Sequence, residues 1–227
     1  MNNLIELKNI SKHYITNKKT KILKKINFKF KKGLIYSLVG PSGSGKSTLL
    51  NLLSLIDKPS SGEIIINNNT IKYNDISKND QLRADKIGII YQQNNLLPDF
   101  NALENVYLAR LAIDNDKNKA IFEATKLIKS FGLSNRLNHF PSELSGGELQ
   151  RIAISRALIN KPEIILADEP TGSLDNSTAK EVFKYLYKLK SKNRLIIYAT
   201  HNRLFANMAD CKLEMIDGII KPLNASK

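Results

Sequence analysis

The stretch whose residue types most clearly indicate chemistry reads Gly40-Pro41-Ser42-Gly43-Ser44-Gly45-Lys46-Ser47-Thr48. An apolar run precedes it and a leucine pattern of helical spacing follows it, so it connects a predicted strand to a predicted helix. Glycine permits positive φ, so successive backbone N–H groups can turn around an anion, and the helix N-terminus adds its dipole. In this context the G-x-x-x-x-G-K-[ST] match predicts a phosphate site, where Lys46 reaches the β- and γ-phosphates and Ser47 binds Mg²⁺.

Two carboxylates, Asp168 and Glu169, follow a second apolar run, Ile164–Ala167. Ligands of α/β folds bind outside the carboxyl ends of the strands. Taken alone, the pair has two equal interpretations, because acidic residues are also common at the start of a helix. With a phosphate loop on another strand, catalysis is favoured: Asp168 holds Mg²⁺, and Glu169 orients and polarises the attacking water.

A histidine, His201, closely follows a third apolar run, Leu195–Ala199. A lone histidine after a strand is usually a packing or capping residue. Here the strand is predicted to run parallel to the one that ends at Asp168, which brings His201 to the same edge of the sheet. We therefore favour a neutral His201 imidazole that contacts the γ-phosphate and positions water.

A second possible anion site reads Leu144-Ser145-Gly146-Gly147-Glu148 and precedes a predicted helix. Its serine and two glycines suit a nest of backbone N–H groups. One chain has no obvious need of two such nests for one triphosphate. The arrangement makes sense if the second nest contacts the γ-phosphate of a nucleotide held by another copy of the chain.

The apolar patterns around these sites predict an α/β protein with a mostly parallel sheet. Residues 4–7 and 26–30 predict early strands that pair antiparallel before the nucleotide core. Further strands are predicted at 64–66, 87–91, 164–167 and 195–199, and the pattern from about Gln93 to Asn160 is helical. The chain is therefore expected to be one domain with a helical insert.

Composition sets outer limits on these interpretations. The 227 residues contain no apolar run near the roughly 18 that a membrane-spanning helix needs, and the N-terminus does not read as a signal peptide. The single cysteine, Cys211, excludes an intrachain disulfide, fits a reducing compartment and is expected in a strand.

The formal net charge of +14 indicates an anionic partner or a compositional bias, because lysine is spread along the whole chain. One run contains lysines and no acidic residue: Lys18, Lys19, Lys21, Lys24, Lys25, Lys29, Lys31 and Lys32. A solvated sheet face is the favoured interpretation of this run, and contact with phospholipid or a partner is the alternative.

Together these motifs resemble those of the ATP-binding subunits of ABC transporters, over nearly the whole chain. In order, the family's motifs map onto Gly40–Thr48 (Walker A), Gln92 (Q-loop), Leu144–Glu148 (signature), Ile164–Glu169 (Walker B), Ser173-Leu174-Asp175 (D-loop) and His201 (switch histidine). By the same resemblance, Tyr14 would be the A-loop aromatic residue that stacks on adenine. The signature ends in Glu148 where glutamine is commoner, a variant accepted in the exporter-like branch.

The resemblance implies specific roles. It assigns nucleotide binding to Tyr14, Gly40, Pro41, Ser42, Gly43, Ser44, Gly45, Lys46, Ser47, Thr48, Ser145, Gly146 and Gly147. It assigns catalysis to Lys46, Gln92, Glu169 and His201, and Mg²⁺ binding to Ser47, Gln92 and Asp168. It implies ATP and Mg²⁺ as cofactors, a homodimer that sandwiches two ATP molecules, integral membrane transporter subunits as partners, and no nucleic acid partner.

The implied fold is that of a P-loop NTPase (RecA-like): a mostly parallel core with an N-terminal antiparallel β subdomain and an inserted α-helical subdomain. Residues 1–92 and 161–227 would form the core and 93–160 the helical subdomain with the signature. The location implied is peripheral, on the cytoplasmic face of the inner membrane.

The segments Tyr91–Val106, Pro141–Arg151 and Lys212–Gly218 are most similar to ATPases of lipoprotein-releasing transporters, which move lipoproteins from the inner toward the outer membrane. The alternative is a related ATPase of the macrolide-exporter or cell-division type, which exports another substrate or signals mechanically. An ABC-type ATPase acting on DNA or ribosomes usually has a coiled-coil insert or two fused cassettes, which this chain lacks. A small-molecule kinase would not need the second nest.

The segment that follows the Q-loop glutamine contains four residues that are unusually apolar for a connecting loop: Leu96, Leu97, Pro98 and Phe100. Pro98 prevents them from forming one amphipathic helix. We expect them to form a groove for a helix of a membrane subunit. The alternative is that they seat the helical insert on the core.

Overall fold

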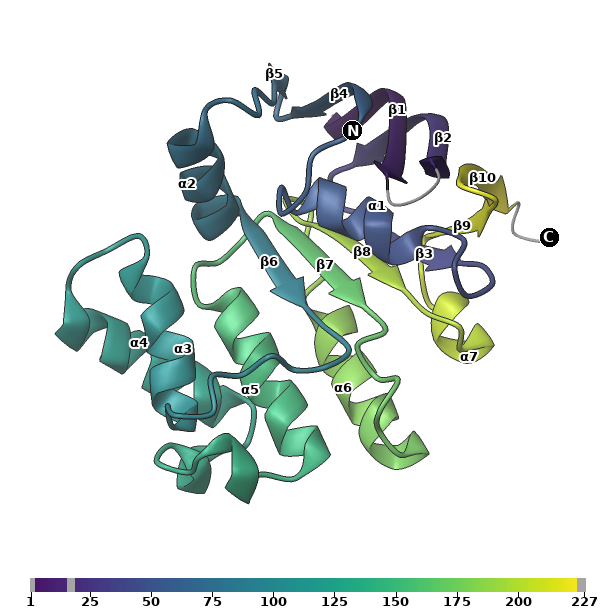
Figure 1. Cartoon of the computed structure of the whole chain (residues 1–227). Helices are drawn as coiled ribbons and strands as arrows, with labels where there is room; N and C mark the ends of the chain where they lie inside the picture. The colour runs from purple at the N-terminus through teal and green to yellow at the C-terminus, as the bar shows by residue number, and fades with distance from the viewer. Residues whose placement is uncertain (1–2, 16–18, 224–227) are drawn as a thin grey trace. The chain divides into compact units, whose positions relative to one another are not determined.

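The computed structural model describes residues 3–15 and 19–223, with Lys19 described by its backbone alone. Its contacts divide the chain into two compact units. Figure 1 labels the helices and strands along the chain. The first unit comprises residues 1–80, 166–169 and 190–227, and the second comprises 81–165 and 170–189. The first contains most of the strands and the phosphate loop, and the second contains most of the helices.

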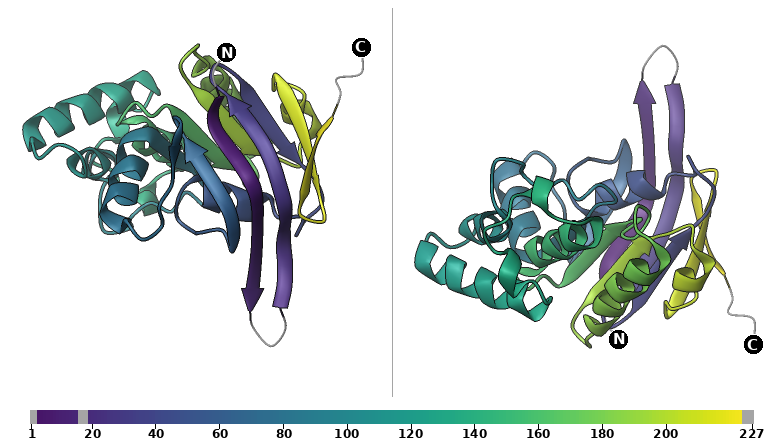
Figure 2. Two further views of the ribbon diagram at one scale, coloured as in Figure 1. Left: turned by 90° about the horizontal axis from the view of Figure 1, so that it is seen from above. Right: turned by 90° about the horizontal axis from the view of Figure 1, so that it is seen from below.

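An antiparallel sheet of order β2-β1-β4-β5 lies in the first unit. Its strands are β1 (Asn3–Ile15), β2 (Lys19–Lys31), β4 (Ser61–Ile66) and β5 (Asn69–Thr70). In both views of Figure 2, β1 and β2 run side by side. The antiparallel pairing is confirmed, but both N-terminal strands are longer than predicted. The second half of β1 contains polar residues and therefore shows no hydrophobic alternation that would predict a strand. Backbone hydrogen bonds to β2 maintain the strand there.

The main sheet of the first unit has the order β10-β9-β3-β8-β7. It contains β3 (Ile35–Val39), β7 (Ile164–Asp168), β8 (Leu195–Ala199), β9 (Cys211–Ile216) and β10 (Ile219–Leu223). Strands β8 and β9 flank β3 and run parallel to it, and β10 pairs antiparallel with β9. The predicted α/β class with a mostly parallel core is thus confirmed, and Cys211 does begin a strand.

Two helices complete the first unit: α1 (Lys46–Leu53), which follows β3, and the short α7 (Arg203–Ala206). Helix α1 begins at Lys46 as predicted and buries its four leucines, Leu49, Leu50, Leu52 and Leu53. That burial seats the phosphate loop on the core.

The basic run lies mostly on β2, where Lys21, Lys24, Lys25, Lys29 and Lys31 are exposed. Lys29 pairs with Glu6 on the neighbouring strand β1, with 3.1 Å between Nζ and Oε1. Lys18 and the side chain of Lys19 lie outside the described residues. The exposure agrees with the solvated-face interpretation, and contact with lipid stays a prediction.

The second unit is mainly helical. Helix α2 (Ile76–Lys86) leads into it, and β6 (Ile87–Ile90) lies beside β7, whose first residues Ile164 and Ile165 belong to this unit. Then come α3 (Ala102–Leu111), α4 (Lys117–Ser130), η1 (Ser134–Arg136), η2 (Pro141–Glu143), α5 (Gly146–Leu158) and α6 (Asn176–Lys188). The prediction of a helical pattern from about Gln93 is wrong at its start: residues 93–101 form no helix. The first helix begins at Ala102, where Asn101 and Glu104 form a capping box.

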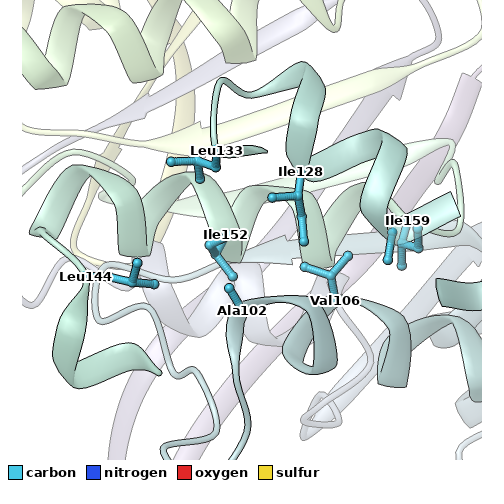
Figure 3. Close-up of a cluster of buried hydrophobic side chains, with 8 residues drawn as sticks. Ala102, Val106, Ile128, Leu133, Leu144, Ile152 and Ile159 are labelled. Carbon is cyan, nitrogen blue, oxygen red and sulfur yellow. The ribbon is translucent and has the colours of Figure 1, made fainter. Parts of the chain in front are cut away.

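A cluster of apolar side chains from α3, α4, α5 and the segments that connect or follow these helices forms the core of the helical part (Figure 3). Its members are Ala102, Val106, Ala124, Ile128, Leu133, Leu144, Ile152 and Ile159. Strand β6 and helix α6 group with these helices in the second unit. The boundaries predicted at 92/93 and 160/161 for a helical subdomain stay a prediction.

The described part of the chain has no helix that is both long and apolar enough to cross a membrane.

The cluster in Figure 3 leads to a prediction about stability. Ile128 is fully buried there, so Ile128→Ala should lower the free energy of unfolding by about 2–5 kcal/mol through lost burial and a residual cavity. Urea denaturation followed by circular dichroism measures this. On the same helix, Phe122 is 70% exposed, and Phe122→Ala should change the free energy by less than about 0.5 kcal/mol. Equal effects of the two substitutions would contradict the assigned core.

Candidate active site

The phosphate loop between β3 and α1 depends on glycines whose backbone no other residue adopts easily. Gly40 has φ of 152° and Gly45 of 104°. A Cβ atom on Gly40 would lie 2.1 Å from the backbone oxygen of Met215, and one on Gly45 would lie 2.8 Å from Leu23 Cδ2. The loop therefore passes too close to β9 and β2 to carry side chains at these points.

The polar groups of the loop suit an anion. Lys46 Nζ donates hydrogen bonds to the carbonyl oxygens of Gly40 and Pro41, both at 2.9 Å, which hold the ammonium over the loop. Ser44 is 5% exposed, and its hydroxyl has no hydrogen-bond partner among the described residues. A cation, an unpartnered buried hydroxyl and a glycine-lined turn are what bound phosphates would use. The residues of the loop therefore fit the phosphates of a nucleoside triphosphate.

At the ends of β7 and β8 the structure joins two predicted catalytic residues. His201 Nδ1 lies 2.9 Å from Glu169 Oε2, and the backbone N–H of His201 donates to the same oxygen at 3.3 Å. The Glu169 side chain is 15% exposed and that of His201 73%. Glu169 thus has a fixed carboxylate, and His201 presents most of its ring to solvent.

The backbone of Glu169 is strained. Its φ is +46°, a left-handed conformation that costs a non-glycine residue roughly 1–2 kcal/mol. A hydrogen bond from its N–H to the Ala199 carbonyl, 3.0 Å long, holds it there. Such outliers often mark functional sites, because the surrounding structure must keep the residue in place. Asp168 precedes it as the half-buried last residue of β7, with Ser47 exposed at the start of α1.

Tyr14, the predicted adenine-stacking residue, lies on β1 and is 43% exposed. Its hydroxyl donates to Asp57 Oδ2 at 2.9 Å. Burial raises the pKa of the Tyr14 phenol, the hydrogen bond to Asp57 raises it further, and a hydrogen bond with Thr48 acts in the opposite direction. Because Thr48 belongs to α1, the ring lies beside the helix that begins at the phosphate loop.

In the second unit, the signature residues form the start of α5. Ser145 is the N-cap: its hydroxyl accepts from the Glu148 N–H at 3.3 Å, and Glu148 Oε2 accepts from the Ser145 N–H at 2.8 Å. This reciprocal capping box fixes the first turn. Ser145 and Gly146 are exposed, whereas Gly147 is buried against Thr178, whose Cγ2 would lie 2.4 Å from an added Cβ.

Glu148 has a second partner that the sequence did not reveal. Arg136 Nε donates to Glu148 Oε1 at 2.8 Å. This bond and the bond from the Ser145 N–H lower the pKa of Glu148 to about 2. The arginine lies 12 residues away on η1, so no local pattern could indicate the pair.

The predicted Q-loop glutamine, Gln92, is exposed just after β6. Helix α5 holds the backbone around it: Gln150 Nε2 donates to the Tyr91 carbonyl at 3.5 Å, and Arg156 donates to the carbonyls of Asn94 and Asn95 at 2.8 and 2.6 Å. Burial lowers the pKa of Arg156. Gln150 and Arg156 were not found from the sequence, because their hydrogen-bond partners are backbone atoms about 60 residues away.

Beyond Gln92, the apolar residues divide into two kinds. Leu96 packs against the apolar cluster of the helical part, whereas Leu97 is 45% and Phe100 38% exposed. The alternative that these residues seat the helical insert on the core stays a prediction. Buried Asn105 fixes the loop: its amide donates to the carbonyls of Leu97 and Phe100 and accepts from the Leu97 N–H. Asn105 therefore fixes the backbone that carries the two exposed apolar side chains, and the groove stays a prediction.

The structure places the predicted site residues in two groups. Tyr14, Gly40–Thr48, Asp168, Glu169 and His201 lie in the first unit. Gln92, Ser145, Gly146 and Gly147 lie in the second, with Asp175, which caps α6 through bonds from the N–H groups of Ser177 and Thr178. Their individual roles stay predictions.

Comparison with known proteins identifies the family of the chain. Residues 23–172 match the model of the ABC transporter family. The chain belongs to this family. It is 46% identical to the "Lipoprotein-releasing system ATP-binding protein LolD" of Rickettsia felis, over 96% of this chain and 98% of that protein. It is 39% identical to the LolD protein of Shewanella frigidimarina, over 98% of this chain and 94% of the relative.

A solved structure of the ATP-binding cassette MJ0796, a dimer in a post-hydrolysis state bound to ADP and Pi, superposes with a TM-score of 0.89. It is 36% identical and covers 98% of this chain and 100% of that chain. The predicted P-loop NTPase fold and the predicted ABC-type ATPase are thereby confirmed. The chain is the ATP-hydrolysing subunit of an ABC transporter.

The capping box of this ABC cassette leads to a prediction about pH. Glu148→Gln keeps an acceptor for the Ser145 N–H but loses the charge that faces Arg136, so the free energy of unfolding at pH 7 should fall by about 1 kcal/mol. The folded pKa, about 2, lies below the ordinary 4.5. The stabilisation is therefore present above pH 4.5 and is lost as the pH falls from 4.5 through 2. Urea denaturation at several pH values checks this.

Glu143→Gln is the matched control. Glu143 also accepts a backbone N–H, from Phe140 at 2.7 Å, but it has no arginine partner among the described contacts. Its substitution should give the smaller change at pH 7. If the difference in free energy of unfolding between Glu148→Gln and wild type were the same at pH 7 and at pH 3, the ion pair with Arg136 would contribute nothing.

Proposed function

We propose that this chain is the motor subunit of an ABC transporter that drives release of lipoproteins from the inner membrane toward the outer membrane. Support for the cargo is the similarity to LolD proteins over nearly the full length of both chains. The observation that carries the ATP-driven role is the Glu169–His201 pair at 2.9 Å, in the unit that also contains the phosphate loop.

In this proposal the first unit binds and cleaves ATP. The loop N–H groups and Lys46 hold the β- and γ-phosphates. Ser47 and Asp168 offer the oxygen ligands that Mg²⁺ prefers, and the bound ion would offset phosphate charge. Glu169 accepts a proton from a water molecule while the oxygen of that water attacks the γ-phosphorus. The bond between the γ-phosphorus and the oxygen bridging to the β-phosphate then breaks, which leaves ADP and phosphate. His201 keeps the Glu169 carboxylate in place.

The second unit would serve a second copy of the chain. The exposed Ser145 and Gly146 at the start of α5 offer a hydroxyl and N–H groups for the γ-phosphate bound by the partner. ATP would then bridge two copies, and hydrolysis would remove the bridge. The dimeric state of the MJ0796 cassette supports this arrangement.

The surface formed by Leu97 and Phe100 would receive a helix from an integral membrane subunit. Two exposed apolar side chains on a loop fixed by Asn105 suit the apolar face of such a helix. The chain would thus act as a peripheral protein on the cytoplasmic side of the inner membrane.

Glu169→Gln tests the catalytic proposal. The amide cannot accept the proton from water, so hydrolysis should fall at least about 100-fold while ATP binding persists. With ATP and Mg²⁺ the variant should elute as a dimer in size-exclusion chromatography with light scattering. Glu63→Gln removes the same charge from an exposed position on β4 and should leave hydrolysis unchanged. Hydrolysis by Glu169→Gln within a few-fold of wild type would exclude Glu169 as the base.

Phe100→Asp tests the membrane partner. A charge on this surface should leave basal hydrolysis by the isolated chain near wild type but abolish its stimulation by membrane subunits copurified from native membranes and placed in nanodiscs. Release of a lipoprotein from the same nanodiscs should stop as well. Phe122→Asp, at another exposed apolar site, is the control and should preserve stimulation. Normal stimulation of the Phe100 variant would refute the docking surface, and stimulation of wild type without lipoprotein release would refute the cargo.

A further inference from the structure

A charged group lies beneath the ring of Tyr14. Lys12 is two residues earlier on β1, and its Nζ lies 4.8 Å from the centroid of the Tyr14 ring. The same Nζ pairs with Asp57 Oδ1 at 2.6 Å and donates to the Lys58 carbonyl at 2.8 Å. Lys12 is only 7% exposed. Burial of an ammonium group is costly unless it is paired, and Lys12 contacts two oxygens and an aromatic face.

Asp57 is the centre of this cluster. One oxygen accepts from Lys12 and the other accepts from the Tyr14 hydroxyl at 2.9 Å. The Lys58 N–H also donates to Asp57 Oδ1, at 2.7 Å. Burial of Asp57 acts to raise its pKa, but these hydrogen bonds and the charge of Lys12 together outweigh burial and lower the pKa. The carboxylate therefore holds the ring of Tyr14 at its hydroxyl end while Lys12 covers a face.

The cluster is fixed to the phosphate-loop helix. The backbone N–H groups of Ile56 and Asp57 both donate to the Asn51 carbonyl, at 3.1 and 3.2 Å, and Asn51 lies one turn after Ser47 in α1. The ring plane of Tyr14 is thus set relative to the helix whose first residues face the phosphates. A nucleotide has its base and its phosphates at a set distance, so both contacts must be placed together.

We propose that the buried Lys12–Asp57 pair positions the Tyr14 ring for the adenine of ATP, with Lys12 on one face of the ring and the base on the other. Lys12 does not touch the nucleotide and acts through Tyr14. The inference depends on the proposed adenine-stacking role of Tyr14. The competing explanation is that the pair only ties β1 to the loop after α1.

The test compares two ligands of the full-length chain: ATP, and inorganic triphosphate, which has no base. Lys12→Met keeps most of the side-chain volume and removes the charge. Isothermal titration should show ATP binding weakened about tenfold and triphosphate binding unchanged. Lys58→Met removes a lysine charge from the exposed neighbouring position and should change neither affinity. Equal weakening of ATP and triphosphate by Lys12→Met would overturn the proposal in favour of the structural explanation.

A double-mutant cycle shows whether Lys12 acts through the ring. Tyr14→Ala should weaken ATP binding, and adding Lys12→Met to it should produce no further loss. A further tenfold loss would show that Lys12 acts independently and would overturn the inference. ATP affinity unchanged by Tyr14→Ala would instead remove the stacking role itself. A weakened Tyr14→Ala with an unaffected Lys12→Met would leave stacking intact and reject the positioning by Lys12.

Should Lys12→Met fail to fold, Tyr14→Phe answers the same question at a partly exposed position. It keeps the ring and removes the hydroxyl that Asp57 holds. ATP binding about threefold weaker, with triphosphate binding unchanged, would support positioning of the ring by the cluster. Wild-type affinity of Tyr14→Phe for both ligands would show that the ring needs no such support.

Discussion

The backbone of the phosphate loop can follow its path only because Gly40 and Gly45 have no side chain. Gly40 lies against the Met215 carbonyl of β9, and Gly45 lies against Leu23 of β2. The loop is also bonded to its surroundings, because the Gly218 N–H donates to the Ser44 carbonyl and the Lys24 N–H donates to the Gly218 carbonyl. Both sheets of the first unit therefore hold the loop, and the phosphate site depends on their packing. An anion-binding turn must be rigid in this way, since N–H groups free to rotate would hydrogen-bond to water instead.

The edge of the main sheet sets the second requirement. Glu169 keeps a left-handed backbone because β8 supplies the Ala199 carbonyl, and the same strand leads to His201, which reaches back to the Glu169 carboxylate. Two neighbouring strands thus determine one carboxylate position. The strain at Glu169 is offset by the hydrogen bond and the packing of the completely buried β8.

In the second unit, one helix connects two of the predicted functional segments. Helix α5 begins at the Ser145–Glu148 capping box, where Arg136 holds the carboxylate, and along its length Gln150 and Arg156 hold the backbone next to Gln92. A displacement of the 91–100 segment by a partner would therefore act on α5, and a displacement of α5 would act on that segment. This contact gives the proposed coupling between membrane subunit and nucleotide a physical route within a single unit.

Local sequence alone determined much about this protein. The spacing of Gly40, Lys46 and Ser47, the apolar runs before Asp168 and His201, and the Ser145–Glu148 box each concern residues close in the chain, whose pattern of glycines, caps and burial is a property of a single turn, helix or strand. The parallel core and the ATPase family followed from them. The length of β1 did not, because polar residues there are held by hydrogen bonds to a neighbouring strand.

Only the tertiary structure decided which side chains support these motifs. Asp57 lies 43 residues from Tyr14, Arg136 lies 12 residues from Glu148, and Arg156 lies about 60 residues from the backbone that it holds. Such pairs leave no periodic trace in the sequence, because a lysine, an arginine or an aspartate has the same type whether it faces water or a partner. The charge of Lys12 is informative only once folding has buried it beneath the ring of Tyr14. The sequence determined the reactive groups, and the packing of distant segments determined what holds each of them in place.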